Sequence, residues 1–281
     1  LGSEIPWELI YLALQLFGSY SNKSGAETFK QSFQTTWKNV SNCLLYPHSW
    51  VRLAATRLIY LMVEQRENFE FPPSDYDVQT IAFRVFRQLG APSISEKLAD
   101  ASVKILVQII ISWKEKDQQY ITPKGQEHEE EIDDEEELKY TSSVDFAVSK
   151  AAHILRSEKL VLSESFVGKK AMIQLLALMV QILDSATIEK ESEKIIMSLF
   201  MFLEKENSID EQEEELQDLA KECLQFLESK LTVSQFTTAY AAVKQKVYVR
   251  RQERKAKRAV LAVKAPDVAA NTKFKKHARS R

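Results

Sequence analysis

The stretch HSWVRLAATRLIYLMV, residues 48–63, decides the fold class of this chain. Its apolar residues recur every three or four positions, a spacing that places them along one side of an α-helix. The small pair Ala54-Ala55 allows a neighbouring helix to approach closely. We therefore expect a helix packed against other helices, with a buried stripe made of Val51, Ala54, Ala55, Leu58, Leu61 and Met62.

Segments with the same helical spacing lie on both sides of this stretch. Proline and glycine separate them, at Pro47, at Pro72-Pro73 and at Gly90-Ala91-Pro92, because neither residue continues a helix well. The predicted helices cover residues 5–19, 24–45, 77–89, 95–113, 143–155, 164–183, 188–204 and 209–231.

The helices follow one another as pairs joined by a short turn, at about forty residues per pair, which is the period of HEAT and armadillo repeats. One pair cannot bury its own apolar faces, so the pairs must stack. We predict an all-α, HEAT/armadillo-like α-solenoid with an acidic disordered insertion and a basic C-terminal helical extension. The expected parts are helical repeats at 1–113, an acidic loop at 114–140, further repeats at 141–231, and a long helix with a basic tail at 232–281.

The apolar content of the helices predicts which of them lie deepest. Residues 164–183 are apolar on nearly every side, so this helix should be the most buried. The helix that begins at Ser143 should bury one face, formed by Val144, Val148, Ala151, Ala152 and Leu155. Cys43 and Cys223 are far apart on apolar faces and are expected to be reduced core residues.

The stretch from His48 to Val63 resembles the second helix of a HEAT repeat. Val51 and Arg52 match the Val-Arg pair of that repeat. His48 and Ser49 stand where an Asp is usual, which departs from the Asp–Arg ladder that joins such repeats. The resemblance implies that Arg52 bonds within or between repeats and has a structural role.

Residues 127–137 contain nine acids and His128. So acidic a run repels itself and is predicted to be a disordered insertion. Two functional alternatives stay open: a metal site that uses His128, and an intramolecular contact with the basic end of the chain, which salt would screen.

The C-terminal end is strongly basic. From Lys244 onward there are 14 Lys or Arg against two acids, a net charge of +12, so residues 1–243 carry −14 to give the total of −2. A helix should open at Val233, dock on the body through Phe236, Tyr240, Val243 and Val247, and become basic on all sides beyond Tyr248. Such asymmetry predicts a polyanion partner or a nuclear-localisation signal. The candidate RNA-binding residues are Lys244, Lys246, Arg250, Arg251, Arg254, Lys255, Lys257, Arg258, Lys273, Lys275, Lys276 and Arg279.

The sequence RRQERKAKRA, the Val-x-x-Pro-x-x-Ala-Ala element at Val263–Ala270 and the final Lys-Lys-His cluster identify a family. With PHSWVRLAATRL at residues 47–58, they resemble the C-terminal region of the large HEAT-repeat component of the small-subunit processome, the down-regulated-in-metastasis family. The resemblance implies a nuclear, mainly nucleolar scaffold in small-subunit ribosomal RNA maturation. It also implies pre-ribosomal RNA, a box C/D small nucleolar RNP and other processome proteins as partners.

Catalytic motifs are absent from the sequence. It has no glycine-rich phosphate loop, no CxxC, no HExxH and no GxSxG, and its four histidines are scattered. We therefore predict no catalytic residue, no metal, no cofactor and no small-molecule substrate. The most apolar stretch, residues 171–183, is too short to span a bilayer, so no membrane partner is expected.

Three functional hypotheses follow. The first is a non-catalytic scaffold in small-subunit biogenesis whose basic tail contacts RNA phosphates without reading bases, since only Tyr248 and Phe274 are aromatic there. The second is a HEAT-repeat protein-interaction scaffold, of the transport or phosphatase-regulatory type, whose tail is a nuclear-localisation signal. The third hypothesis is an enzyme, but the sequence shows no set of residues typical of an active site.

Overall fold

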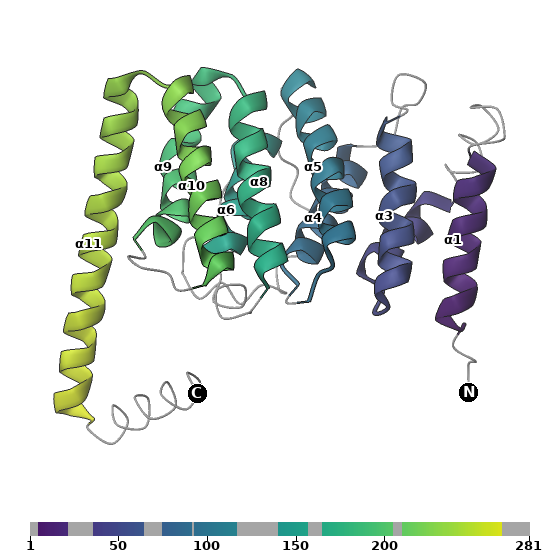
Figure 1. The fold of residues 1–281 in the computed structure, drawn as a ribbon, viewed down its shortest axis with the longest axis horizontal. Coiled ribbons are helices and arrows are strands. Elements are labelled where there is room, and N and C mark those ends of the chain that lie inside the picture. Colours follow the sequence, from purple (N-terminus) through teal and green to yellow (C-terminus); the bar gives the residue numbers. More distant parts are fainter. Residues whose placement is uncertain are drawn as a thin grey trace. The chain divides into compact units, whose positions relative to one another are not determined.

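The computed structural model describes residues 5–21, 36–64, 75–91, 93–116, 140–156, 165–204 and 210–265 (Figure 1). The chain divides into two compact units, residues 1–231 and residues 232–281. The predicted acidic insertion around residues 127–137, with His128, falls outside the described residues. So do Phe29 and Phe33 of the second predicted helix.

Every regular element of the first unit, among the residues described, is a helix. Residues 36–42 are helical and continue into the short 3₁₀ helix η1. The elements are α1 (Trp7–Ser21), η1 (Cys43–Leu45), α3 (Ser49–Glu64), α4 (Asp75–Leu89), α5 (Glu96–Lys116), α6 (Ser143–Arg156), α8 (Phe166–Ile182), α9 (Ser185–Leu203) and α10 (Glu211–Lys230).

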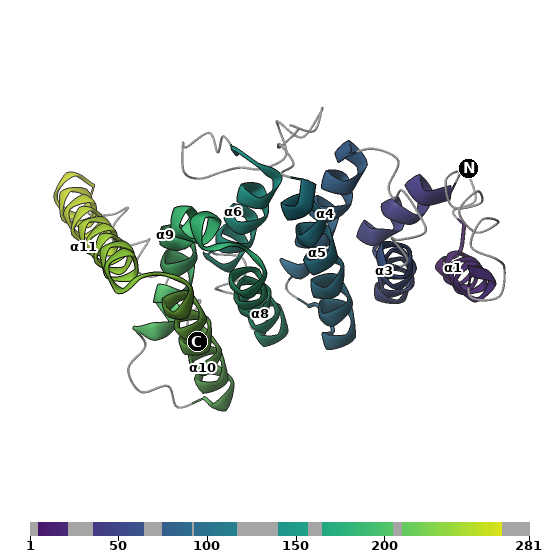
Figure 2. The same ribbon diagram turned by 90° about the horizontal axis from the view of Figure 1, so that it is seen from above.

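The helices of this unit form two stacked rows, which Figure 2 shows end-on. In one row α1 packs against α3, α3 against α5, α5 against α8, and α8 against α10. In the other row η1 packs against α4, α4 against α6, and α6 against α9. The rows are joined by sequential pairs: η1 with α3, α4 with α5, α6 with α8, and α9 with α10. The predicted all-α solenoid of HEAT-like helix pairs is confirmed.

The core lies between the rows and along each of them. The stripe predicted for α3 is buried, except that Leu61 is only half-buried and Ile59 takes its place with no exposed surface. A helix in a solenoid has neighbours on both sides as well as behind it, so its buried arc is wider than one stripe. On α5 the buried residues include Leu98, Ile105, Ile109 and Trp113, which recur on one side of the helix.

The turn before α3 is fixed by Arg52, which matches the HEAT pattern, and by His48, which departs from it. Arg52 Nη1 donates to the carbonyl oxygens of Tyr46 (2.9 Å) and Pro47 (2.7 Å), and burial lowers the pKa of this guanidinium. His48 Nδ1 accepts a hydrogen bond from the backbone N–H of Trp50 (3.3 Å), as a helix-capping Asp would. The His48 ring stacks on Trp7 of α1, with 3.6 Å between ring centroids. Arg52 is thus structural and acts within one repeat.

A buried glutamine ties four elements together, a feature that the sequence did not predict. Gln88 of α4 donates through Nε2 to the carbonyl of Leu44 in η1. Its Oε1 accepts from Thr56 Oγ1 of α3 and from Ser102 Oγ of α5, each at 3.3 Å. Since buried polar groups are costly without partners, this network specifies how the two neighbouring pairs fit together.

Helix α6 is the most buried of the described helices, so the prediction that residues 164–183 hold this position is wrong. Twelve of the fourteen residues of α6 are buried, against eight of seventeen in α8. Helix α6 has α4 and α9 beside it and α5 and α8 behind it. Its polar residues tolerate this burial because other side chains satisfy them: Ser143 Oγ, for example, accepts from Gln79 Nε2 of α4 at 2.8 Å.

Helix α1 keeps a row of large apolar side chains in contact with solvent. Ile5, just before the helix, and Leu9, Leu12, Leu16 and Tyr20 on it follow one another at intervals of three or four residues, and each is 47% or more exposed. The opposite side packs on α3 and includes the buried Leu14. This helix thus presents a second apolar face, as an internal helix of a solenoid does.

Candidate nucleic-acid interface

The basic end of the chain begins on one long helix, α11 (Val233–Lys264). A capping box opens it: Thr232 Oγ1 accepts from the backbone N–H of Gln235 (3.3 Å), and Gln235 Oε1 accepts from the backbone N–H of Thr232 (2.9 Å). No glycine or proline interrupts the 32 residues of the helix. Ala265 ends it just before Pro266 in the sequence, which cannot continue the helical hydrogen bonding.

Burial divides α11 along its length. In the first part, Ala239 and Val243 are buried, and Phe236, Tyr240 and Val247 are half-buried. The predicted docking of these residues on the first unit stays a prediction. From Tyr248 to Lys264 every residue is exposed, and Lys244 and Lys246 are exposed as well. The eight candidate RNA-binding residues from Lys244 to Arg258 therefore all carry their charge at the surface.

The basic residues of α11 occupy one half of the helix, which corrects the prediction that they surround it. Successive residues of an α-helix are rotated by about 100° about its axis. With that rotation, all the lysines and arginines between residues 244 and 264 fall within an arc of about 180°. The remaining arc holds Gln245, Tyr248, Val249, Gln252, Glu253, Ala256, Ala259, Val260 and Val263. We call the first arc the basic half of α11 and the second arc the uncharged half. The uncharged half contains one charged residue, Glu253, at its border with the basic half.

Lys264 belongs to the basic half and is missing from the predicted set. It lies five helical turns after Lys246 and on the same line, with Lys257 between them. Lys264 could have been included if the helix had been expected to continue through the apolar run at residues 259–263. With Lys264 the basic half holds nine cationic side chains.

The cationic side chains of the basic half repel one another. Lys246, Arg250, Arg254 and Arg258 form a ladder of like charges four residues apart, and Arg251 and Lys255 form another such pair. Each like-charge pair at this spacing destabilises a helix by roughly 0.2–0.5 kcal/mol. An anion that binds along this surface would remove the repulsion and release condensed counterions of its own.

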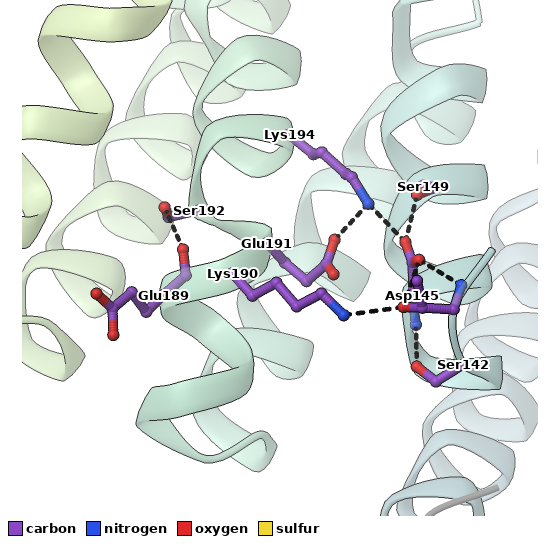
Figure 3. Close-up of polar contacts among 9 residues, drawn as sticks. Ser142, Asp145, Ser149, Glu189, Lys190, Glu191, Ser192 and Lys194 are labelled. Carbon is purple, nitrogen blue, oxygen red and sulfur yellow. Dashed lines mark hydrogen bonds and ion pairs between the residues drawn. The ribbon is translucent and has the colours of Figure 1, made fainter. Parts of the chain in front are cut away.

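The structure also contains a buried polar cluster between α6 and α9 (Figure 3). Lys194 Nζ lies 2.5 Å from Asp145 Oδ1 and 2.7 Å from Glu191 Oε2. Asp145 Oδ1 also accepts from Ser149 Oγ (3.0 Å), and Asp145 Oδ2 accepts from the backbone N–H and the hydroxyl of Thr141 (2.8 and 3.0 Å). Lys190 Nζ donates to the same Thr141 hydroxyl at 2.9 Å. One ammonium thus serves two carboxylates from two helices.

Burial and pairing shift the pKa values within this cluster in different directions. Burial acts to raise the pKa of Asp145, but hydrogen bonds from Lys194 and Thr141 outweigh it and leave the pKa below its usual value. Burial raises the pKa of Glu191 above its usual value, against the opposing hydrogen bond from Lys194. The pKa of Lys194 is raised, because bonds to both carboxylates outweigh its desolvation. Lys194 is therefore a firmly held cation and a structural tie, unsuited to act as a base or nucleophile.

The two cysteines and the acidic surface of α10 are further candidates for a site. The pKa of the Cys223 thiol is raised to about 12, mainly by burial. Burial also raises the pKa of the half-buried Cys43 thiol. Neither cysteine forms a disulfide. In the described part of the chain no group of three or more His, Cys, Asp or Glu side chains is placed to hold a metal ion. A shallow hollow on α10 is lined by Leu219 and by the acids Glu211, Glu214, Glu215, Asp218 and Glu222. Its charge would repel a nucleic acid.

Comparison with known proteins decides the family. The family described as "Small subunit processome component 20 homolog, C-terminal" matches residues 10–281. This chain belongs to that family. The resemblance to the large HEAT-repeat component of the small-subunit processome is thereby confirmed.

Two curated relatives of this processome component align with nearly the whole chain. The Saccharomyces cerevisiae protein named U3 small nucleolar RNA-associated protein 20 is 45% identical over 283 residues, which cover 100% of this chain and 11% of the yeast protein. The Schizosaccharomyces pombe protein of the same name is 25% identical over 275 residues, covering 94% of this chain and 10% of that protein. The chain spans about a tenth of the length of the curated relatives that it matches.

The structure describes eight of the twelve predicted site residues of this family member. Lys244, Lys246, Arg250, Arg251, Arg254, Lys255, Lys257 and Arg258 come together on the basic half of α11. Lys273, Lys275, Lys276 and Arg279 lie outside the described residues. Within the described ranges, no helix has both the length and the hydropathy that crossing a bilayer requires.

Proposed function

We propose that this chain is a non-catalytic scaffold segment of the small-subunit processome and takes part in the processing of pre-ribosomal RNA. Membership of the processome component 20 family supports this assignment. The stacked pairs of the first unit suit it, since solenoids present extended surfaces to partners. The partners that we propose are other processome proteins and the box C/D small nucleolar RNP, consistent with the U3 small nucleolar RNA in the relatives' names. The proposed location is the nucleolus, within the nucleus.

The second part of the proposal is that α11 contacts RNA phosphates. The observation that carries it is the basic half: nine exposed lysines and arginines on one side of a helix whose own like charges oppose each other. Phosphate contacts of this kind supply affinity that is independent of sequence and falls with salt. We extend the proposed contact to Lys273, Lys275, Lys276 and Arg279, which follow in the sequence.

The binding part of this proposal is tested by a variant of α11 in which three of the nine cations are replaced by neutral side chains. In R250Q/R251Q/R254Q three cations become polar side chains that keep a good helix propensity. We expect the slope of log K against log salt for RNA binding to fall by about 2–3, at roughly 0.7–0.9 for each phosphate contact. The matched control K97Q/K104Q/K116Q removes three exposed lysines from α5 and should leave the slope unchanged. Equal slopes for both variants and the unaltered chain would contradict RNA contact by these arginines.

The cellular test is RNA crosslinking with residues 244–281 present or deleted. The deletion protein should carry an unrelated nuclear import signal, so that loss of import does not imitate loss of binding. Tail-dependent crosslinks to pre-ribosomal RNA or to small nucleolar RNA would support the scaffold with an RNA-binding tail. If the deletion protein with the added import signal keeps both its crosslinks and its function, the basic end is an import signal on a protein-interaction solenoid.

A further inference from the structure

We propose that the basic half of α11 binds the phosphate backbone of double-stranded RNA in preference to single strands. The inference rests on the proposed RNA contact and names the class of RNA. Three features of residues 244–264, all of which the structure describes, carry it: the width of the basic half, the side chains that it lacks, and its length.

The basic half is wide enough for the cations on its two edges to contact two different phosphate strands. Lys246, Lys257 and Lys264 lie along one edge of the arc, and Lys244, Arg251 and Lys255 lie along the other edge. An α-helix with its side chains is roughly 10–12 Å across, so the two edges point away from each other and cannot share one strand. A duplex groove is bordered by two phosphate strands. The shallow minor groove of A-form RNA is open enough for a helix to reach both.

The composition of the basic half disfavours single strands. Proteins that hold single strands stack the bases on aromatic side chains. The sole aromatic residue between 244 and 264 is Tyr248, which lies on the uncharged half at its border with the basic half, so it could stack on at most one base. The three residues that accompany the cations are Val247, Leu261 and Ala262, which offer no base a stacking partner or a hydrogen bond.

The same composition provides no amide that could read adenine. Bidentate recognition by amides would need Asn or Gln, and both glutamines of this segment, Gln245 and Gln252, lie on the uncharged half. Arginine can also read guanine, but it does so in the major groove, which in an RNA duplex is too deep and narrow for side chains to read. The arginines and lysines are therefore suited to phosphates. Duplex RNA is recognised mostly through its shape, its phosphates and its 2′-hydroxyls, which fits this surface.

The length of the basic half sets the size of the contact. Twenty-one residues of α-helix extend for about 30 Å at 1.5 Å per residue. Cations occur along all of this length, and the longest interval without one is the five residues between Arg258 and Lys264. The surface is therefore a continuous, two-edged strip.

The decisive variant moves charge from one half of α11 to the other and leaves the composition unchanged. In R250Q/Q252R/A256K/K257A two cations leave the basic half and two appear on the uncharged half, so net charge and overall residue content stay the same. The partner variant R250K/K257R changes side chains at two of these positions and keeps both charges in place. Circular dichroism and the unfolding midpoint of each full-length variant verify that the fold is retained.

The measurement is fluorescence anisotropy of the full chain with a 20-base-pair RNA duplex of mixed sequence and, separately, with one of its strands. We expect the duplex to bind at least about tenfold more tightly than the strand. The charge-moving variant should lose roughly tenfold or more in duplex affinity at 0.1 M salt, and about 1.8 in salt slope, because two of the phosphate contacts are removed. Its affinity for the single strand should change less than twofold, and R250K/K257R should match the unaltered chain.

The outcomes separate this inference from the proposed function. Equal binding of duplex and strand, or a charge-moving variant that binds duplex normally, would overturn the preference for duplex and leave RNA contact in place. Absence of binding to either RNA at low salt would remove the RNA contact itself.

Discussion

Lys194 Nζ of α9 lies 2.5 Å from Oδ1 of Asp145 on α6. The same nitrogen lies 2.7 Å from Glu191, one turn away on its own helix. Both carboxylates are almost fully buried, at 7% and 1% exposure, while the lysine reaches them from a half-exposed position. One cation is therefore shared by the buried ion pairs at the contact between these two helices, which belong to successive pairs of the solenoid.

Substitution of this lysine should destabilise the fold strongly. Lys194→Met removes the cation and leaves two buried carboxylates uncompensated, which should cost about 2–3 kcal/mol of unfolding free energy. Urea denaturation of the full chain measures it. The control Lys190→Met removes the exposed bond to Thr141 and should change stability by less than about 0.5 kcal/mol. A similar loss in both variants would contradict the role of Lys194.

The two carboxylates should respond oppositely to substitution and pH. The pKa of Asp145 is depressed, so its stabilising effect is present at neutral pH and is lost as the pH falls through that low value. The pKa of Glu191 is raised, so the folded chain gains stability as the pH falls through that raised value towards the usual glutamate value. We expect Asp145→Asn to destabilise the chain at pH 7, whereas Glu191→Gln maintains or increases stability and removes the gain on acidification. Thermal unfolding between about pH 2 and pH 8 tests both signs, because the scan must reach below the usual aspartate pKa to show the loss at Asp145.

The glutamine between the first pairs should be intolerant of an apolar replacement. Gln88→Met keeps the size of the side chain but leaves the Leu44 carbonyl without this donor and the Ser102 hydroxyl without this acceptor, while Thr56 Oγ1 keeps the Arg52 carbonyl at 2.7 Å. We expect a loss of about 2 kcal/mol, since an unsatisfied buried polar group costs roughly 1–3 kcal/mol. Gln181→Met on the exposed side of α8 is the matched control. A Gln88→Met chain as stable as this control would show that the network adds little.

The exposed row on α1 should control self-association. In Leu9→Gln/Leu16→Gln two large apolar side chains with 57% and 70% exposure become polar, and the unfolding free energy should change by less than about 1 kcal/mol. Light scattering should show less association at high concentration. Leu14→Gln, on the buried side of the same helix, should instead reduce stability by more than about 2 kcal/mol. Unchanged association in the double variant would contradict the role of this row.

Much of the fold follows from apolar spacing alone. Val51, Ala55 and Leu58 were predicted to be buried and are, because the spacing of large and small apolar residues reports the side of a helix that meets other helices. Buried polar residues could not be found in this way. Gln88 and Asp145 look like solvent-facing positions in the sequence. Their hydrogen-bonding partners, Leu44 and Lys194, are 44 and 49 residues away, so only the assembled solenoid reveals them.

The candidate interface was predictable in composition but not in geometry. The charge count from Lys244 onward pointed to a polyanion without any coordinates. The separation into a basic and an uncharged half depends on the helix remaining unbroken to Lys264, which a count of charges does not show. Once α11 is continuous, the rotation between successive residues fixes the position of every charge.

The packing of α1 also implies a gradient of local opening along the first unit. In the described structure the main packing of α1 is on α3, whereas α6 has neighbours on both sides and behind it. In a solenoid each repeat is held mainly by its neighbours, so within the chain as given the free energy of opening should be smaller for a helix with few packed neighbours than for one with several. Amide hydrogens of α1 should therefore exchange with deuterium first, and those of α6 should be among the last, exchanging only when the whole unit unfolds.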